Sequence, residues 1–193
     1  MEKVYAVDFE GNGEPQPDIV ELALVELVAW KDVGRTYCWL FRPSAPITKF
    51  VSRIHGLTDE DVASAPNFGD VEDDLQMLLD DATLIGHNAR GDVRALKRKM
   101  PDWSPRRTLD TMQLAKRLKP GLSSYGLQNL LAALDIKTAT QSDRGGRPHS
   151  ALFDACATAS LFLRLTNENT QYSLEHMINF ATVREGSDQT SLL

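Results

Sequence analysis

Residues 4–13 of the chain read VYAVDFEGNG, an apolar run that ends in two carboxylates and a glycine-containing turn. The apolar run is typical of a short buried strand. Asp8 and Glu10 stand two positions apart near its end, and side chains two apart on a strand project to the same face. An apolar strand with two inward acids is costly unless something binds them. The stretch therefore predicts a strand whose end carries a binding site.

The rest of the chain follows an α/β order. The apolar runs 19–29 and 36–41 predict two more strands, which form a meander with the first. Beyond Pro43 and Pro46, the pattern becomes helical and then mixed. It predicts a helix over 70–81, a strand over 82–88, a helix over 92–100, a strand and helix within 106–118, and helices over 123–134, 150–165 and 173–182. A serine is expected to cap the helix over 123–134.

Length and composition indicate one domain. A chain of 193 residues with 42% hydrophobic content can bury one sizeable core, so we expect a catalytic domain over 1–183 and a polar tail over 184–193. Cys38 and Cys156 lie in hydrophobic segments without metal-ligand spacing, which predicts reduced core thiols in a cytosolic protein. The chain lacks a signal-peptide pattern and any apolar stretch of about 18 residues. We therefore expect a soluble, cytoplasmic protein without a membrane partner.

The net charge of −6 argues at first against a nucleic-acid partner, because phosphate contacts usually require a basic surface. The acidic excess, however, is concentrated in residues 59–81, and a basic run follows in residues 90–107. Two interpretations stay open: a local basic strip beside Asp92, or solvated helix faces of opposite sign. Bound cations would also offset part of the charge at an acidic site. Net charge therefore does not exclude a nucleic-acid substrate.

A second polar cluster occurs in LIGHNARGDVRAL, residues 84–96. It places Asp92 just after a predicted strand, at or near the start of the following helix. Taken alone, Asp92 is best explained as an ordinary helix N-cap. His87 is equally compatible with a hydrogen-bonded histidine in the core.

The third cluster, PHSALFDAC at residues 148–156, is the most specific. His149 and Asp154 are five positions apart, more than one helical turn, so His149 must precede the helix if the two are to meet. Asp154 interrupts an apolar helix surface, where an unpaired carboxylate would be expensive and a metal would neutralise it.

Together the clusters supply four carboxylates and one histidine. Carboxylate oxygens hold paired divalent cations, and an imidazole with a pKa near working pH can activate the attacking water. These are the groups that two-metal phosphodiester hydrolysis needs. The set therefore predicts a metal-dependent nuclease whose catalytic residues are Asp8, Glu10, Asp92, His149 and Asp154.

The three clusters, in this order, resemble the DnaQ-like exonucleases of the DEDDh group, the family of DNA polymerase III epsilon-type proofreaders and of exonuclease X. The segments FRPSAPITKFVSRIHGLTDEDVASAPNF (41–68) and TLDTMQLAKRLKPGLSSYGLQNL (108–130) are also similar to this family, and the resemblance covers about Val4 to Leu165. It implies an α/β, ribonuclease H-like fold with a five-stranded mixed sheet flanked by helices. The implied activity is 3′→5′ hydrolysis from DNA 3′ ends that releases nucleoside 5′-monophosphates, in DNA repair or proofreading.

The resemblance also implies roles for individual residues. Asp8, Glu10 and Asp154 would hold the first of two Mg²⁺ ions, Asp8 with Asp92 would hold the second, and Mn²⁺ would be a substitute. His149 would be the general base. The residues expected around the terminal nucleotide are Phe9, Ile54, His55 and Asn88.

Two positions depart from the family pattern. Gly91 stands where a phenylalanine usually precedes the aspartate of the second cluster, which predicts a missing core aromatic and a less constrained backbone at Asp92. Gly11 stands where relatives often have threonine, which removes a hydroxyl near the substrate.

Two alternative functions stay open from the sequence. One is a non-catalytic docking module, because QTSLL at 189–193 is similar to the short peptides by which bacterial replication proteins bind the sliding clamp. A frayed tail is the simpler interpretation of that segment. The other is a 3′→5′ exoribonuclease of the same fold. A clamp or polymerase partner and the oligomeric state, a homodimer included, also stay open.

Overall fold

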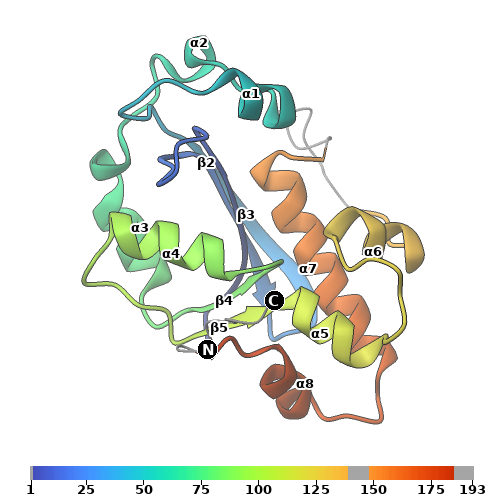
Figure 1. Ribbon diagram of the computed structural model, residues 1–193. Helices are drawn as coiled ribbons and strands as arrows, with labels where there is room; N and C mark the ends of the chain where they lie inside the picture. Colours follow the sequence, from blue (N-terminus) through green and yellow to red (C-terminus); the bar gives the residue numbers. More distant parts are fainter. Residues whose placement is uncertain (1, 139–147, 185–193) are drawn as a thin grey trace, which may run out of the picture.

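The computed structural model describes residues 2–138 and 148–184 of the chain. Its strands form one mixed sheet in the order β3-β2-β1-β4-β5 (Figure 1). β1 pairs antiparallel with β2 and parallel with β4; β2–β3 is antiparallel and β4–β5 parallel. The strand bounds are β1 Val4–Gly11, β2 Ile19–Val28, β3 Asp32–Leu40, β4 Thr83–Gly86 and β5 Arg107–Asp110. The predicted five-stranded mixed sheet and its initial meander are confirmed.

The third strand begins earlier than the sequence predicts, at Asp32 instead of residue 36. The cause is a tight turn in which Ala29 and Trp30 both have positive φ and the Lys31 N–H donates to the Val28 carbonyl at 3.0 Å. Two residues of positive φ give a hairpin whose twist matches the strands, so pairing starts directly after the turn.

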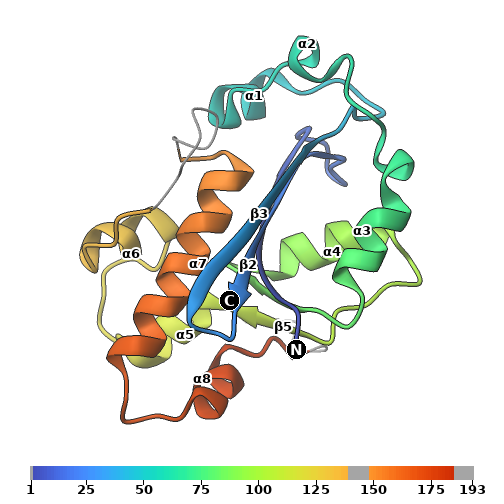
Figure 2. The same cartoon turned by 180° about the vertical axis from the view of Figure 1, so that it is seen from behind.

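Helices cover both faces of the sheet (Figures 1 and 2). A shared apolar cluster packs α5, α6, α7 and α8 on one face, and a second cluster packs α3 and α4 on the other. The helix bounds are α1 Lys49–His55, α2 Asp59–Val62, α3 Glu72–Leu79, α4 Arg90–Lys99, α5 Thr111–Leu118, α6 Leu127–Ala133, α7 Ala151–Glu168 and α8 Leu174–Ala181, with a 3₁₀ turn η1 at Phe68–Asp70. Among the described residues, no helix has the length and apolarity needed to cross a membrane.

Two local predictions are wrong. The N-cap of α6 is Gly126 and not a serine, because Ser124 lies two residues earlier and its hydroxyl accepts a hydrogen bond from the Gly126 N–H at 3.4 Å. Cys156 is buried in α7 as expected, but Cys38 is exposed. Cys38 lies on β3, which is an edge strand of the sheet and therefore presents part of its surface to solvent.

The alternation of side chains along β1 determines where the predicted acids lie. Val4 and Ala6 belong to the cluster under α7, whereas Tyr5 and Val7 belong to the cluster under α3 and α4. Asp8 continues the first series and therefore faces α7, and so does Glu10.

Candidate active site

Four acids converge at the carboxyl end of β1. Asp8 and Glu10 come from the strand itself, Asp92 from the first turn of α4, and Asp154 from the first turn of α7. Burial raises the pKa of Asp8 well above its ordinary value, and the neighbouring charges of Asp92, Asp154 and Glu10 raise it further. Such mutual repulsion in a buried site favours the binding of a cation.

His149 lies at the mouth of this cluster. Glu10, His149 and Asp154 each offer one ligand atom, and these atoms lie within 4.8 Å of one another. His149 Nδ1 is 4.0 Å from Asp154 Oδ2, and the His149 backbone N–H donates to the same oxygen at 3.2 Å. The His149 side chain is 55% exposed, whereas that of Asp154 is 11% exposed. The histidine precedes the helix, as its spacing from Asp154 predicts.

The backbone of His149 is held in an uncommon conformation. Its φ is 62°, in the left-handed region that non-glycine residues rarely adopt. Ser150 follows as the N-cap of α7, its hydroxyl accepting from the Phe153 N–H at 3.3 Å. Left-handed non-glycine residues often mark functional sites. Here the conformation turns the chain into α7 and leaves the imidazole beside the acids.

Asp92 is not a helix cap. It is the third residue of α4, whose N-cap is Ala89, and it is buried. Its carboxylate accepts a hydrogen bond from the Phe9 backbone N–H, which ties α4 to β1. Burial raises the pKa of Asp92. Gly86 leaves room for this approach, because a Cβ there would lie 3.3 Å from Asp92 Oδ2 and 2.7 Å from the Ala89 Cβ.

Glu21 is a fifth carboxylate, which the sequence analysis missed. It pairs in register with Glu10 on the neighbouring strand and is buried. Its Oε2 accepts from the Ala151 backbone N–H at 2.9 Å, at the start of α7. Burial raises the pKa of Asp154, and the charge of Glu21 contributes to that rise. The strand alternation used for Asp8 also identifies Glu21, which interrupts an apolar run on the face that packs under α7.

Gln128 is a second polar group that the sequence analysis missed. Its Nε2 donates to Asp154 Oδ1 at 3.1 Å, so α6 supports the carboxylate oxygen that does not accept from the His149 backbone. This hydrogen bond partly counters the rise in the pKa of Asp154. A glutamine on an amphipathic helix carries no sequence signal that would distinguish it from a solvated residue.

The two candidate substrate residues on α1 have different environments. Ile54 is 40% exposed, whereas His55 is buried at 1% exposure. His55 Nδ1 accepts from the Leu57 N–H at 3.1 Å, and Nε2 lies 3.2 Å from the Gly11 carbonyl. Because a carbonyl oxygen only accepts, Nε2 carries the hydrogen. His55 thus joins α1 to the end of β1, one residue beyond Glu10.

The other two candidates lie near the end of β1 and in the turn between β4 and α4. The Phe9 side chain packs with the cluster under α3 and α4, on the face opposite Asp8. Asn88 is exposed, has a φ of 65°, and donates its backbone N–H to Asp110 Oδ1 at 3.2 Å. Its neighbour His87 is half-buried and hydrogen-bonded: Nε2 lies 2.9 Å from the Tyr125 carbonyl, and burial lowers its pKa.

The two glycine departures differ in their surroundings. A Cβ at Gly91 would have no heavy atom within 4 Å, so the position faces open space and the predicted loss of a core aromatic is wrong. At Gly11, where the β1–β2 register shifts, a Cβ would lie 2.8 Å from the Pro17 Cβ. A threonine at position 11 would therefore collide with the following turn.

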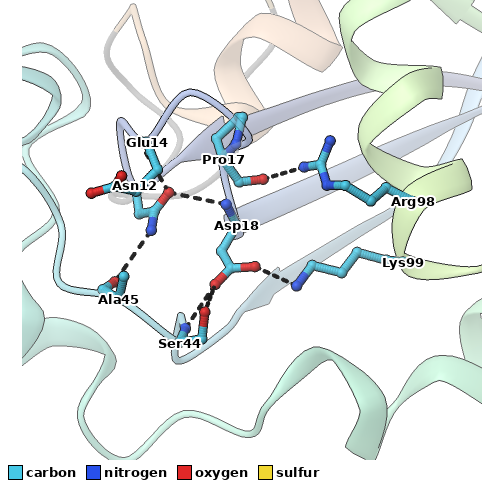
Figure 3. Close-up of polar contacts among 8 residues, drawn as sticks. All are labelled: Asn12, Glu14, Pro17, Asp18, Ser44, Ala45, Arg98 and Lys99. Carbon is cyan, nitrogen blue, oxygen red and sulfur yellow. Dashed lines mark hydrogen bonds and ion pairs between the residues drawn. The ribbon is translucent and has the colours of Figure 1, made fainter.

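Part of the basic run on α4 has a structural role. Lys99 pairs with Asp18, and Arg98 donates to the Pro17 carbonyl (Figure 3). Burial opposes ionisation of Asp18, but hydrogen bonds from Lys99 and Ser44 outweigh it and lower the pKa to about 2. Asp18, Ser44 and Lys99 border a pocket of about 190 Å³ that none of the predicted catalytic residues lines. The contacts fasten the turn that follows Glu10, so Arg98 and Lys99 are not simply part of a solvated helix face.

Comparison with known proteins identifies the family. The RNase_T exonuclease family matches residues 6–162, and the chain belongs to this family. The chain is 31% identical over 193 residues to DNA polymerase III PolC-type of Thermotoga maritima, an alignment that covers 96% of the chain and 13% of that much longer protein. It is 28% identical over 181 residues to DNA polymerase III subunit epsilon of Haemophilus influenzae, which covers 90% of the chain and 68% of that protein.

The fold has a solved counterpart. The structure of exonuclease X in complex with 5′ overhanging duplex DNA superposes with a TM-score of 0.75 at 29% identity, covering 92% of this chain and 98% of that one. The predicted exonuclease family and the ribonuclease H-like fold are thereby confirmed.

Proposed function

We propose that the chain is a metal-dependent 3′→5′ exonuclease that hydrolyses phosphodiester bonds at DNA 3′ ends and releases nucleoside 5′-monophosphates, in DNA repair or proofreading. The observation that carries this proposal is the convergence of Asp8, Glu10, Asp92 and Asp154 from three separate elements beside His149, in a chain of an exonuclease family.

The donor set suits divalent cations. Asp8, Glu10 and Asp154 would hold one ion, and Asp8 with Asp92 a second; hard carboxylate oxygens of this kind suit Mg²⁺, with Mn²⁺ as a substitute. The repulsion that raises the pKa of Asp8 is consistent with this assignment, because bound cations would relieve it. Such ions would stabilise the negative charge that develops on the phosphate and lower the pKa of the attacking water.

His149 would act as the general base. Its imidazole is exposed at the mouth of the cluster, where a water and the terminal phosphate can both reach it. The water oxygen forms a new bond to phosphorus, its proton passes to the imidazole, and the bond to the 3′ oxygen breaks. Asp154 accepts from the His149 backbone N–H, which fixes the position of the base relative to the ligands.

Substrate binding would use residues beside the acids. Ile54, Asn88 and the backbone around Phe9 would surround the terminal nucleotide, and His55 would hold α1 in place for this contact. DNA is the preferred substrate because the 29% identical exonuclease X structure contains duplex DNA. A polymerase partner is consistent with the name of the epsilon relative. A cytoplasmic location stays part of the proposal; the QTSLL segment lies outside the described residues.

The experiment that tests this function uses 5′-labelled single-stranded DNA, recessed duplex DNA and RNA of matched sequence, each with Mg²⁺ or Mn²⁺. We expect a ladder that shortens from the 3′ end, that EDTA abolishes, and that His149→Ala reduces by at least about 100-fold. The variant His176→Ala is the matched control, since His176 lies on α8 and bonds locally to Ser173. An intact wild-type protein that cleaves none of the substrates would contradict the proposal, and faster RNA cleavage would reassign the substrate.

A further inference from the structure

The outer face of α1 combines apolar and basic side chains beside the candidate site. Phe50 is 74% exposed and Ile54 is 40% exposed, and Lys49 and Arg53 are exposed as well. At 3.6 residues per turn, these four side chains occupy one arc of roughly 140°. The opposite side of the helix packs inward through Val51 and the buried His55. The sequence of α1, KFVSRIH, contains no acid.

The location of α1 makes this face relevant to a substrate. The ring of His55 contacts the Gly11 carbonyl, so α1 is attached one residue beyond Glu10. Figure 1 shows α1 next to the start of α7, the helix that carries Asp154. A strand whose 3′ end lies at the acids would therefore pass close to α1.

The charge of α1 contrasts with its surroundings. The chain has a net charge of −6, and the segment directly after α1 is rich in acids. Two of those acids are engaged with the backbone: Asp59 accepts from the Ile47 N–H at 2.8 Å, and Asp61 accepts from the Thr58 N–H at 2.8 Å. Lys49 and Arg53 of α1 are exposed and therefore available to phosphates on this part of the rim.

We propose that the outer face of α1 binds the single-stranded nucleic acid upstream of the 3′-terminal nucleotide, with Phe50 stacking on a base and Lys49 and Arg53 contacting backbone phosphates. An exposed aromatic flanked by cations is the combination by which proteins hold single strands without reading their sequence. This inference rests on the proposed exonuclease function and adds a second binding position beyond the terminal nucleotide.

The test compares Phe50→Ala with wild type on a 5′-labelled decathymidylate and on the p-nitrophenyl ester of thymidine 5′-monophosphate, which has no upstream base. We expect Phe50→Ala to raise KM for the decamer about tenfold with little change in kcat. The increase in KM for the ester should be at least fivefold smaller. Phe50→Trp, which keeps an aromatic ring, should restore the wild-type KM for the decamer. The matched control is Met77→Ala, because Met77 is 69% exposed on α3. The double variant Lys49→Ala, Arg53→Ala removes two phosphate contacts, so it should lower the slope of log KM against the logarithm of the salt concentration by roughly 1.4.

Binding of the labelled decamer, measured by fluorescence anisotropy with Ca²⁺, tests the surface independently of hydrolysis. Equal affinity of wild type, Phe50→Ala and Met77→Ala would overturn the inference while leaving the exonuclease proposal intact. An equal rise in KM of Phe50→Ala for the decamer and for the ester would also overturn the inference, since it would place Phe50 at the terminal nucleotide. If wild type hydrolyses nothing, the exonuclease proposal fails, and the anisotropy comparison still decides whether α1 binds the strand.

Discussion

At the scale of single residues, the site is a set of carboxylates whose charges act on one another. Glu21 belongs to this set although the family pattern does not require it here: it lies beside Glu10 in the sheet, and its charge contributes to the raised pKa values of Asp8 and Asp154. Glu21 also holds the first residue of α7 through the Ala151 N–H. It therefore has both an electrostatic and a positioning role.

The variant Glu21→Gln separates these two roles. The amide oxygen can still accept from the Ala151 N–H, so we expect the melting temperature to change by less than about 2 °C. Removal of one negative charge should weaken cation binding by about 1 kcal/mol, which raises the Mg²⁺ concentration for half-maximal activity roughly fivefold. Activity titrated with Mg²⁺ measures this shift. Glu26→Gln, on the same strand, is the control, and equal Mg²⁺ requirements for both variants would contradict the electrostatic role.

Gly91 provides a second prediction at this scale. It lies within α4, and a Cβ there would meet open space. Because alanine loses less conformational freedom than glycine in a helix, Gly91→Ala should stabilise the protein by about 0.5–1 kcal/mol. Gly13→Ala should do the opposite, since Gly13 has a φ of +85° and a Cβ would lie 2.2 Å from Thr48 Oγ1. Urea unfolding measures both; a Gly91→Ala variant no more stable than wild type would refute the prediction.

At the scale of elements, apolar periodicity accounts for what the sequence predicts correctly. The strands β1, β2 and β4 are buried runs, and α7 is a long apolar helix, so their side-chain patterns are unambiguous. The start of β3 is not predictable in this way, because the edge position of the strand leaves residues 32–36 largely exposed and polar. The short helix α1 was missed because its exposed Phe50 and Ile54 break the expected amphipathic pattern.

Apolar periodicity also decides which site residues the sequence predicts. Asp8 and Asp154 stand out because each interrupts an apolar pattern. Asp92 does not, and its burial depends on α4 packing against β1, a tertiary contact with no local signature. Gln128 reaches Asp154 only because α6 packs against α7, which the sequence alone does not reveal.

Within α7, Thr158 has a hydroxyl that is fully buried and, in the described structure, without a hydrogen-bond partner. Thr158→Val keeps the side-chain shape and removes the unsatisfied group, so it should stabilise the protein by about 1 kcal/mol. Thr166→Val on the same helix is the matched control, because the Thr166 hydroxyl lies 3.0 Å from the Phe162 carbonyl and should give no such gain. Thermal unfolding compares the two. A Thr158→Val variant that melts below wild type would show that the hydroxyl makes a stabilising interaction.

At the scale of the whole molecule, the raised pKa values link stability to pH and to cations. Asp8, Asp92 and Asp154 have higher pKa values in the folded than in the unfolded chain, so the folded state binds more protons. Their contribution to stability is therefore fully present below the ordinary aspartate pKa of about 4 and is lost as pH rises through the folded values. Divalent cations should offset this loss at high pH and compete with protons at low pH.

We therefore expect Mn²⁺ to raise the melting temperature more at pH 8 than at pH 5, relative to EDTA. Differential scanning fluorimetry over this range measures the difference, with Asp8→Asn as the variant in which most of it should disappear. An equal increase at both pH values would show that Mn²⁺ binds somewhere other than the carboxylate cluster.

The bond between Glu21 and Ala151 joins residues 130 positions apart, and it lies directly beside the acids. During synthesis, Asp8, Glu10 and Asp92 are all made before α7, which brings Asp154 and follows the histidine. Contacts of such long range form late in folding because the intervening chain must first be ordered. A nascent or partly folded chain thus lacks a complete hydrolytic centre. The proposed nuclease activity should therefore return in the last phase of refolding, when α7 docks, and a growing chain that has not yet formed α7 should lack it.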